Sequence, residues 1–162
     1  MLYSKEVVMQ FLPHRDPFLF IDSVKSVEHE KGDSFDREKA TVRDLVTTKI
    51  HAQYYTDPAH NIFKGHFPGR PILPGVVQVE MMAQAAGFVL HMLYEDICSI
   101  DLDVALLAVS SAKFRKPILP DMELDIYSIC TRARGIMITS ECEIYHKGEL
   151  MSQAEVMASV RT

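Results

Sequence analysis

Residues 64–75, a stretch dense in proline and glycine, and the apolar run that follows constrain the fold of this chain most strongly. Proline and glycine stiffen and turn the backbone, so this stretch predicts a rigid turn. Residues 76–90 are almost wholly apolar, and a run that is apolar on nearly every side predicts a buried helix, here over about residues 75–94. The sequence thus puts an imidazole, His66, on a stiff turn ahead of a buried helix whose one carboxylate is Glu80. Such a pair suits proton transfer in a dry pocket.

The last third of the chain has the alternating pattern of strands joined by short turns. Four strands are expected there, at residues 105–115, 122–132, 136–145 and 150–160. Short turns between alternating strands indicate an antiparallel sheet with one apolar face. Earlier in the chain we expect a short helix at residues 4–11, strands at 18–27 and 40–50, and a loop at 51–62.

A long apolar helix and an antiparallel sheet each need a partner for burial. The predicted fold class is therefore α+β, with a curved antiparallel β-sheet wrapped around a long central α-helix. A chain of this length without repeats or linkers is expected to form a single domain over residues 1–162.

Charge and cysteine content narrow the partners and the compartment. The net charge of −5 argues against broad nucleic-acid binding, which needs a basic surface. The three cysteines have no CxxC spacing and no signal-peptide pattern precedes them, so a reduced, cytoplasmic location is expected. The longest apolar run is too short and too polar for a membrane span. The histidines have no HxxxH or HExxH spacing, so no metal site is predicted.

Glu80, Gln84, Gly87 and His91 fall on one narrow stripe of the predicted helix, at about 100° per residue. Gln84, one turn on, can hydrogen-bond and orient Glu80. Burial should raise the pKa of Glu80 unless a cation lies close. A raised pKa would let Glu80 act as an acid, with His66 as the base. His91 lies roughly 16 Å from Glu80 along the axis and is expected to be structural. The alternative is that this stripe faces solvent or a subunit interface.

The start of the predicted helix offers hydrogen-bond donors. The backbone N–H groups of Gly75 and Val76 have no partner within the helix, and the helix dipole adds partial positive charge there. Gly75 has no side chain to block a ligand, so a substrate carbonyl could accept from either N–H as enolate charge develops. The alternative is that Gly75 serves only the turn.

The chain resembles a known family in five motifs. These are Leu12-Pro13-His14-Arg15-Asp16-Pro17-Phe18-Leu19, Gly65-His66-Phe67-Pro68-Gly69-Arg70-Pro71, Pro74-Gly75, Glu80 with Ala83-Gln84-Ala85, and Lys113-Phe114-Arg115-Lys116-Pro117. That family is the (3R)-3-hydroxyacyl-[acyl carrier protein] dehydratases of type II fatty acid synthesis. The resemblance covers about residues 10–27 and 60–160.

The resemblance implies a hot-dog fold, and a homodimer whose sheets join edge to edge, often assembled further into a trimer of dimers. It implies active sites at the dimer interface, with His66 facing the partner subunit's Glu80. The substrate would be a 3-hydroxyacyl thioester on the phosphopantetheine arm of acyl carrier protein, with no metal or cofactor. Glutamate at this acidic position favours dehydration alone, whereas the relative that also isomerises the double bond carries aspartate.

An acidic carrier protein would need a local cationic patch on this acidic chain. The candidates are Lys113, Arg115, Lys116, Arg132 and Arg134. The alternative for each of them is a solvated sheet face. Two rival functions remain open from sequence: a hot-dog acyl thioesterase, and a non-catalytic acyl-binding or assembly subunit.

Three features depart from the family pattern. Asp16 replaces an aromatic residue, and Pro120-Asp121 lacks the usual glycine. Residues 28–62 are about a dozen longer than expected. Because this extra length leads into the turn with His66, it is expected to reshape the tunnel mouth or carrier docking.

Overall fold

The computed structural model describes residues 1–161. Its helices and strands are, in chain order, α1 (Lys5–Phe11), β1 (Ser23–Glu28), β2 (Lys49–Tyr55), α2 (Ile62–Gly65), α3 (Gly75–Gly87), β3 (Asp103–Phe114), β4 (Glu123–Arg134), β5 (Met137–His146) and β6 (Glu149–Arg161). Short 3₁₀ helices occupy Gly32–Ser34, Val42–Leu45, Phe88–Met92 and Ile97–Ser99.

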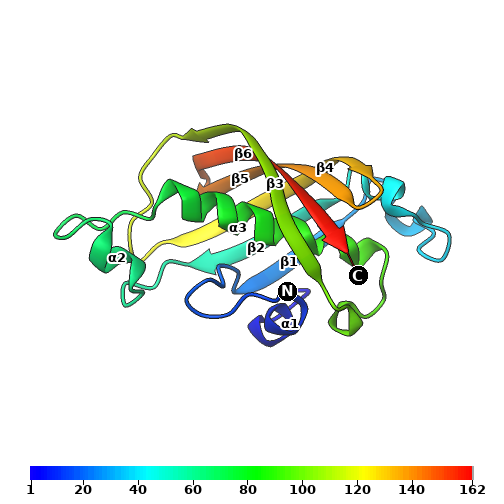
Figure 1. Cartoon of the computed structure of the whole chain (residues 1–162), viewed down its shortest axis with the longest axis horizontal. Coiled ribbons are helices and arrows are strands. Elements are labelled where there is room, and N and C mark those ends of the chain that lie inside the picture. The colour runs from blue at the N-terminus through cyan, green and yellow to red at the C-terminus, as the bar shows by residue number, and fades with distance from the viewer. Residues whose placement is uncertain (162) are drawn as a thin grey trace.

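The strands form one antiparallel sheet in the order β1-β2-β4-β5-β6-β3. Helix α3 lies across this sheet, as Figure 1 shows, and contacts β4, β5 and β6. Strand β3 forms one edge, and its pairing with β6 shifts register twice, near Leu106 and near Ser111. The predicted α+β fold, a curved sheet around a central helix, is confirmed.

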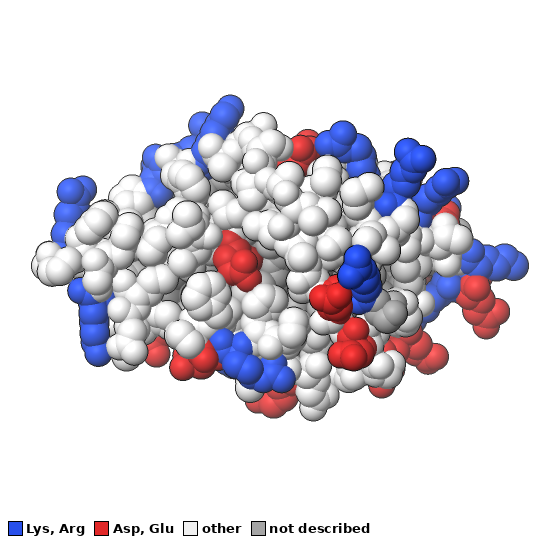
Figure 2. All heavy atoms as spheres, viewed as in Figure 1, with Lys and Arg blue, Asp and Glu red and all other residues white. Residues whose placement is uncertain are grey.

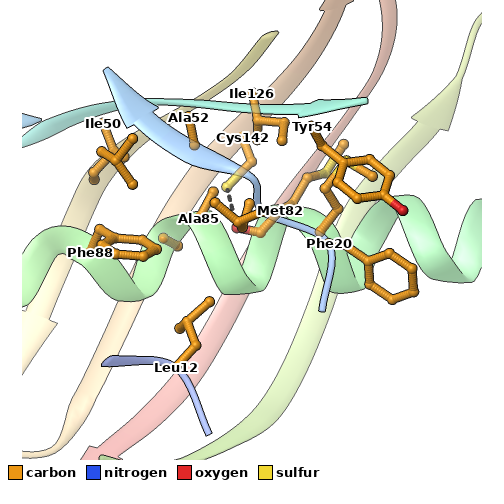
Figure 3. Close-up of a cluster of buried hydrophobic side chains, with 14 of the residues drawn as sticks. Leu12, Phe20, Ile50, Ala52, Tyr54, Met82, Ala85, Phe88, Ile126 and Cys142 are labelled. Carbon is orange, nitrogen blue, oxygen red and sulfur yellow. Dashed lines mark hydrogen bonds between the residues drawn. The ribbon is translucent and has the colours of Figure 1, made fainter. Parts of the chain in front are cut away.

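The core lies between α3 and the concave face of the sheet. Figure 3 shows Met82, Ala85 and Phe88 of the helix region facing Ile126 and Cys142 of the strands. All five side chains are buried. At about 25 cal/mol per Å² of apolar surface, burial of this kind is what holds the helix on the sheet.

The strands of the last third lie close to the predicted positions, whereas two earlier predictions are wrong. The expected strand at 40–50 is instead a 3₁₀ helix, Val42–Leu45, followed by a turn, and only its last two residues are strand. The 3₁₀ helix begins with a capping box between Thr41 and Asp44. Strand β2 follows, mostly within residues expected to be a loop. Its alternate residues are buried and its outward residues are polar, so the sequence did carry the alternation of a half-buried strand. We interpreted its polar residues as a loop and missed that signal.

Two further boundaries differ from the expectation. The strand predicted at 18–27 is confined to β1, because residues 18–20 instead hydrogen-bond to the side chain of Gln84 on α3. The central helix ends at Gly87 and continues as a 3₁₀ turn to Met92. No helix within residues 1–161 is long and apolar enough to cross a membrane.

Residues 28–48, the first part of the longer stretch at 28–62, lie at the end of the sheet opposite to α2 (Figure 1). Strand β2 separates the two ends, and seven residues of strand span about 20 Å. The rest of the longer stretch, residues 56–61, leads directly into α2 and the turn with His66. The expected effect of the extra length on the tunnel mouth or carrier docking therefore stays a prediction.

Candidate active site

His66 is held rigidly in the turn between α2 and α3. The backbone of residues 67 and 70 closes a tight turn through two reciprocal hydrogen bonds of 3.0 and 2.9 Å. The His66 ring stacks on Phe67 at 4.1 Å between centroids, and its Nδ1 donates to the carbonyl oxygen of Ile72 at 2.8 Å. Because a carbonyl can only accept, the proton of the neutral ring lies on Nδ1. Nε2 is left with a lone pair, as a general base requires.

Glu80 is half-buried on α3 and has two hydrogen-bond donors. Gln84 Nε2 donates to Glu80 Oε1 at 2.8 Å, and His14 Nε2 lies 3.1 Å from the same oxygen. The interaction with Gln84 is the orienting contact that the helical spacing suggested. The contact with His14 comes from a segment more than sixty residues earlier in the chain.

The expected rise in the pKa of Glu80 is not observed. The hydrogen bond from His14 lowers the pKa of this carboxyl, burial opposes that shift, and the hydrogen bond from Gln84 adds to it. The prediction assumed a buried carboxylate without a close partner. His14 supplies that partner, and donors to a carboxylate stabilise its charged form.

Glu80 and His14 lie at an apolar cavity between α3 and the strands β3 and β6. This cavity has a volume of about 130 Å³. Its lining comprises Leu12, His14, Glu80, Ala83, Gln84, Gly87, Leu102, Val104, Leu106, Ala158 and Val160. The predicted stripe of Glu80, Gln84 and Gly87 therefore faces a cavity.

The start of α3 is open at the backbone and covered on one side by Phe114. Within residues 1–161, neither the N–H of Gly75 nor that of Val76 has a hydrogen-bond acceptor. A Cβ atom added at Gly75 would lie 2.9 Å from the ring of Phe114. Residue 75 must therefore be small because a side chain from β3 approaches it closely, in addition to any need for ligand access.

Within one chain, no hydrogen bond joins His66 and Glu80. His66 does not line the cavity at Glu80. The acidic residue is instead paired with His14, which the sequence motif contained but to which we assigned no role. Two facts could have identified His14 from sequence. It lies in the motif Leu12-Pro13-His14, and the one carboxylate of the buried helix needs a cation or hydrogen-bond donor close to it.

His91 lies outside this group. Its Nδ1 hydrogen-bonds to the hydroxyl of Tyr3, and burial lowers its pKa. The structural role expected for it agrees with these contacts. Among residues 1–161, no three His, Cys, Asp or Glu side chains are arranged to hold a metal ion.

The basic candidates for carrier binding form two groups, of which only Arg134 is far from the first, because Arg132 contacts Glu155, two residues along β6 from the Gln153 that Arg115 contacts. Lys113, Arg115 and Lys116 lie at the end of β3 beside Phe114, where Arg115 donates to Gln153 and Lys116 pairs with Glu149. In the second group, Arg134 lies opposite Met137 of β5, which in turn lies opposite Ser159 of β6. Ser159 is six residues along β6 from Gln153, and six strand residues span about 20 Å. The other member, Arg132, pairs with Glu155 at 3.4 Å. Figure 2 shows Lys and Arg mainly around the rim of the face that it presents.

Known proteins share this fold and much of this sequence. The family model described as ApeI dehydratase matches residues 42–153. The 3-hydroxyacyl-[acyl-carrier-protein] dehydratase of Agrobacterium fabrum is 33% identical, covering 93% of this chain and 85% of that protein. The same enzyme of Geobacter metallireducens is 36% identical, covering 94% and 89%.

Among solved structures, the dehydratase heterocomplex ApeI:P from Xenorhabdus doucetiae matches with a TM-score of 0.71 at 18% identity, covering 96% of this chain and 91% of that one. A hot-dog-like protein from Thermanaerovibrio acidaminovorans matches with a TM-score of 0.59 at 12% identity, covering 76% and 89%. These likenesses identify the fold as the hot-dog fold. The chain belongs to the 3-hydroxyacyl-[acyl-carrier-protein] dehydratase family.

Proposed function

We propose that this protein is a hydro-lyase of fatty acid biosynthesis that converts (3R)-3-hydroxyacyl-[acyl carrier protein] to the trans-2-enoyl thioester. Membership of the dehydratase family supports this function. The structural observation that carries it is the fixed tautomer of His66, which leaves Nε2 free as a base in the turn that leads to the open helix start at Gly75. The acidic partner is Glu80, at its apolar cavity.

In this mechanism the thioester carbonyl accepts from the N–H of Gly75 or Val76. That contact stabilises the charge that develops when C2 loses its proton. His66 Nε2 removes the C2 proton, the C2–C3 double bond forms, and the C3–O bond breaks. Glu80 is a carboxylate in the free chain, and the bound acyl chain, by excluding water from its cavity, raises its pKa so that it takes up a proton. Glu80 then gives this proton to the leaving hydroxyl, which departs as water. A proton then returns from His66 to Glu80 through solvent. The thioester itself acidifies C2, so the proposal requires no metal or cofactor beyond the substrate's phosphopantetheine.

The complete site is proposed to form between two chains, with His66 facing the partner subunit's Glu80. Strand β3 is an edge strand with exposed apolar side chains, including Leu106 and Leu107, which suit pairing with a second copy. Further assembly into a trimer of dimers is part of the same proposal, and the mass of the particle in solution tests it.

Carrier docking is proposed at Lys113, Arg115 and Lys116 rather than at Arg132 and Arg134. The first group flanks Phe114, whose ring covers Gly75, so a phosphopantetheine arm entering there would reach the helix start directly. Charge reversal at Arg115 and Lys116 should raise KM for a carrier-bound substrate and leave a short pantetheine thioester unaffected. The matched control is reversal at Arg132 and Arg134. Equal effects of the two pairs would contradict this assignment.

The function is tested by following dehydration of a 3-hydroxyacyl carrier substrate. His66→Ala and Glu80→Gln should each lose nearly all turnover; wild-type turnover in either would refute the mechanism. Chains carrying one change each should regain activity when mixed, because a mixed dimer then has one intact site. Release of free thiol instead of enoyl product would favour a thioesterase. Tight acyl-carrier binding without turnover would favour a non-catalytic subunit. Enrichment with cytoplasmic proteins on cell fractionation is also expected.

A further inference from the structure

The two oxygens of the Glu80 carboxylate have different surroundings. Both donors, His14 Nε2 and Gln84 Nε2, reach Oε1, at 3.1 and 2.8 Å. Oε2 has no hydrogen-bond partner among residues 1–161. Two N–H donors on one oxygen fix the rotation of the carboxylate and leave the other oxygen available to a substrate.

The orientation of the Gln84 amide is fixed from the other side. Its Oε1 accepts from the backbone N–H of Phe20 at 2.9 Å, and its Nε2 donates to the carbonyl oxygen of Phe18 at 2.8 Å as well as to Glu80. If the amide were flipped, its NH₂ group would face the backbone N–H of Phe20, and the hydrogen bonds to Phe18, Phe20 and Glu80 would be lost. The residues 12–20, which we call the N-terminal strap, therefore lock the amide that holds Glu80.

His14 belongs to the same strap and contacts Glu80 directly. The side chain of His14 is 23% exposed, and its Nδ1 is buried without a hydrogen-bond partner in the described part of the chain. Because Glu80 Oε1 accepts, Nε2 of the neutral ring carries the proton. A histidine kept at this position with one nitrogen unsatisfied indicates that its contact with Glu80 offsets the cost of that nitrogen.

No other charged group faces Glu80 within residues 1–161. The neighbouring Arg15 turns its guanidinium to the carbonyl oxygens of Leu12 and His14, at 2.9 and 2.7 Å. The residues that β3 and β6 contribute to the cavity are all apolar. On α3, the remaining residues beside the cavity are Ala83, Gln84 and Gly87.

We propose that His14 is a positioning residue for the acid of this reaction: with Gln84 it holds Oε1 of Glu80, so that Oε2 alone exchanges a proton with the 3-hydroxyl of the substrate. This inference rests on the proposed function. The donor also stabilises the carboxylate left after proton transfer, which makes Glu80 a stronger acid than a free carboxyl. Removing His14 should therefore both loosen the carboxylate and raise the pKa of Glu80.

The variant His14→Ala should lower kcat about tenfold or more with KM nearly unchanged, because loss of orientation at the reacting atoms slows the chemical step. Activity that needs protonated Glu80 falls as pH rises through its pKa, so the alkaline limb of the rate profile should move to higher pH in His14→Ala. His14→Gln restores an N–H donor of similar reach, and should recover most of kcat.

The matched control is His60→Ala. His60 hydrogen-bonds to the carbonyl oxygen of Pro17, so this change also removes a contact to the N-terminal strap but removes no hydrogen bond to Glu80 or Gln84. It should keep the wild-type kcat and pH profile. Equal losses in His14→Ala and His60→Ala, or a His14→Gln enzyme that folds but recovers nothing, would overturn the proposal.

A second measurement does not depend on turnover. The ¹³C chemical shift of the Glu80 carboxyl reports its pKa directly, and that pKa should rise in folded His14→Ala and stay unchanged in His60→Ala. An unchanged Glu80 pKa in His14→Ala would refute the role of His14. If the pKa of Glu80 rises in His14→Ala but the wild-type protein never dehydrates the substrate, the proposed function is refuted and the contact of His14 with Glu80 is not. The two failures are therefore distinguishable.

Discussion

Replacing Gly75 with alanine separates the stability of the helix start from its proposed role at the substrate carbonyl. The added Cβ would lie 2.9 Å from the Phe114 ring, whereas carbon atoms prefer about 3.5–4.0 Å. The ring must therefore retreat by about 0.5–1 Å. Phe114 ends an edge strand and is 51% exposed, so it can rotate outward at about 0.5–1.5 kcal/mol.

A compensating gain opposes that cost. Gly75 does not adopt a left-handed φ, so alanine fits its backbone and restricts the unfolded chain, which stabilises by about 0.4–1 kcal/mol. The net change in the free energy of unfolding should stay within about 1 kcal/mol, or a Tm shift below about 4 °C for a chain of this size. Thermal unfolding followed by circular dichroism measures it.

Activity should respond differently. A methyl group and a displaced ring at the N–H of residue 75 should push the thioester carbonyl away, and a misplacement of about 1 Å costs up to about 100-fold. We expect kcat/KM to fall at least about tenfold in Gly75→Ala. Adding Phe114→Leu should relieve the crowding without restoring turnover. A Gly75→Ala enzyme with wild-type kcat/KM and an unchanged Tm would show that no substrate atom approaches this helix start.

Three further predictions concern the core, the acid limb of stability and the thiols. Phe88→Ala, at a fully buried ring packed 4.9 Å from Phe11, should cost about 3–5 kcal/mol, and a loss below 1 kcal/mol by urea unfolding would contradict this packing. The lowered pKa of Glu80 stabilises the folded chain fully above pH 4.5, the ordinary pKa of the group, and this stabilisation is lost as pH falls through the lower folded pKa. The Tm difference between wild type and Glu80→Gln should therefore narrow below pH 4.5. A Tm difference that stays constant down to pH 2 would argue against this contribution of Glu80. Burial raises the pKa of Cys142 to about 12 and that of Cys130 to about 11. The pKa of Cys98 is also raised, by burial and by the neighbouring Asp96, but its side chain is only partly buried, so Cys98 should be the first to react with a thiol reagent and Cys98→Ser should abolish that first phase.

How far the sequence predicts this fold depends on the range of the interactions involved. Strands β4 to β6 follow one another through short turns, and their alternation is a local signal that the structure confirms. The stretch at 40–50 misled because its threonines and valines favour strands, while the capping box from Thr41 to Asp44 favours a 3₁₀ turn. Strand β2 alternates buried residues with the outward His51 and Gln53, which is the same local signal, and the prediction of a loop there gave its polar residues too much weight.

The same distinction applies to the candidate site. The turn with His66 and the contact of Gln84 with Glu80 are local, and helical spacing was enough to expect the second. The contact of His14 with Glu80 joins residues 66 positions apart, and no periodicity reports such a pair. The sign of the pKa shift at Glu80 depended on that one long-range partner, which is why it was predicted wrongly.

The N-terminal strap has a consequence for how the enzyme comes into being. Residues 12–20 precede the helix that receives them by some sixty residues, and the edge strand β3 pairs with β6, which begins more than thirty residues after β3 ends. Contacts so distant in sequence form slowly. A chain that stopped before β6 would carry His14, Glu80 and Gln84 but would lack Ala158 and Val160, which enclose their cavity from that strand. The residues of the chemistry would then be present without the wall that shields them from water.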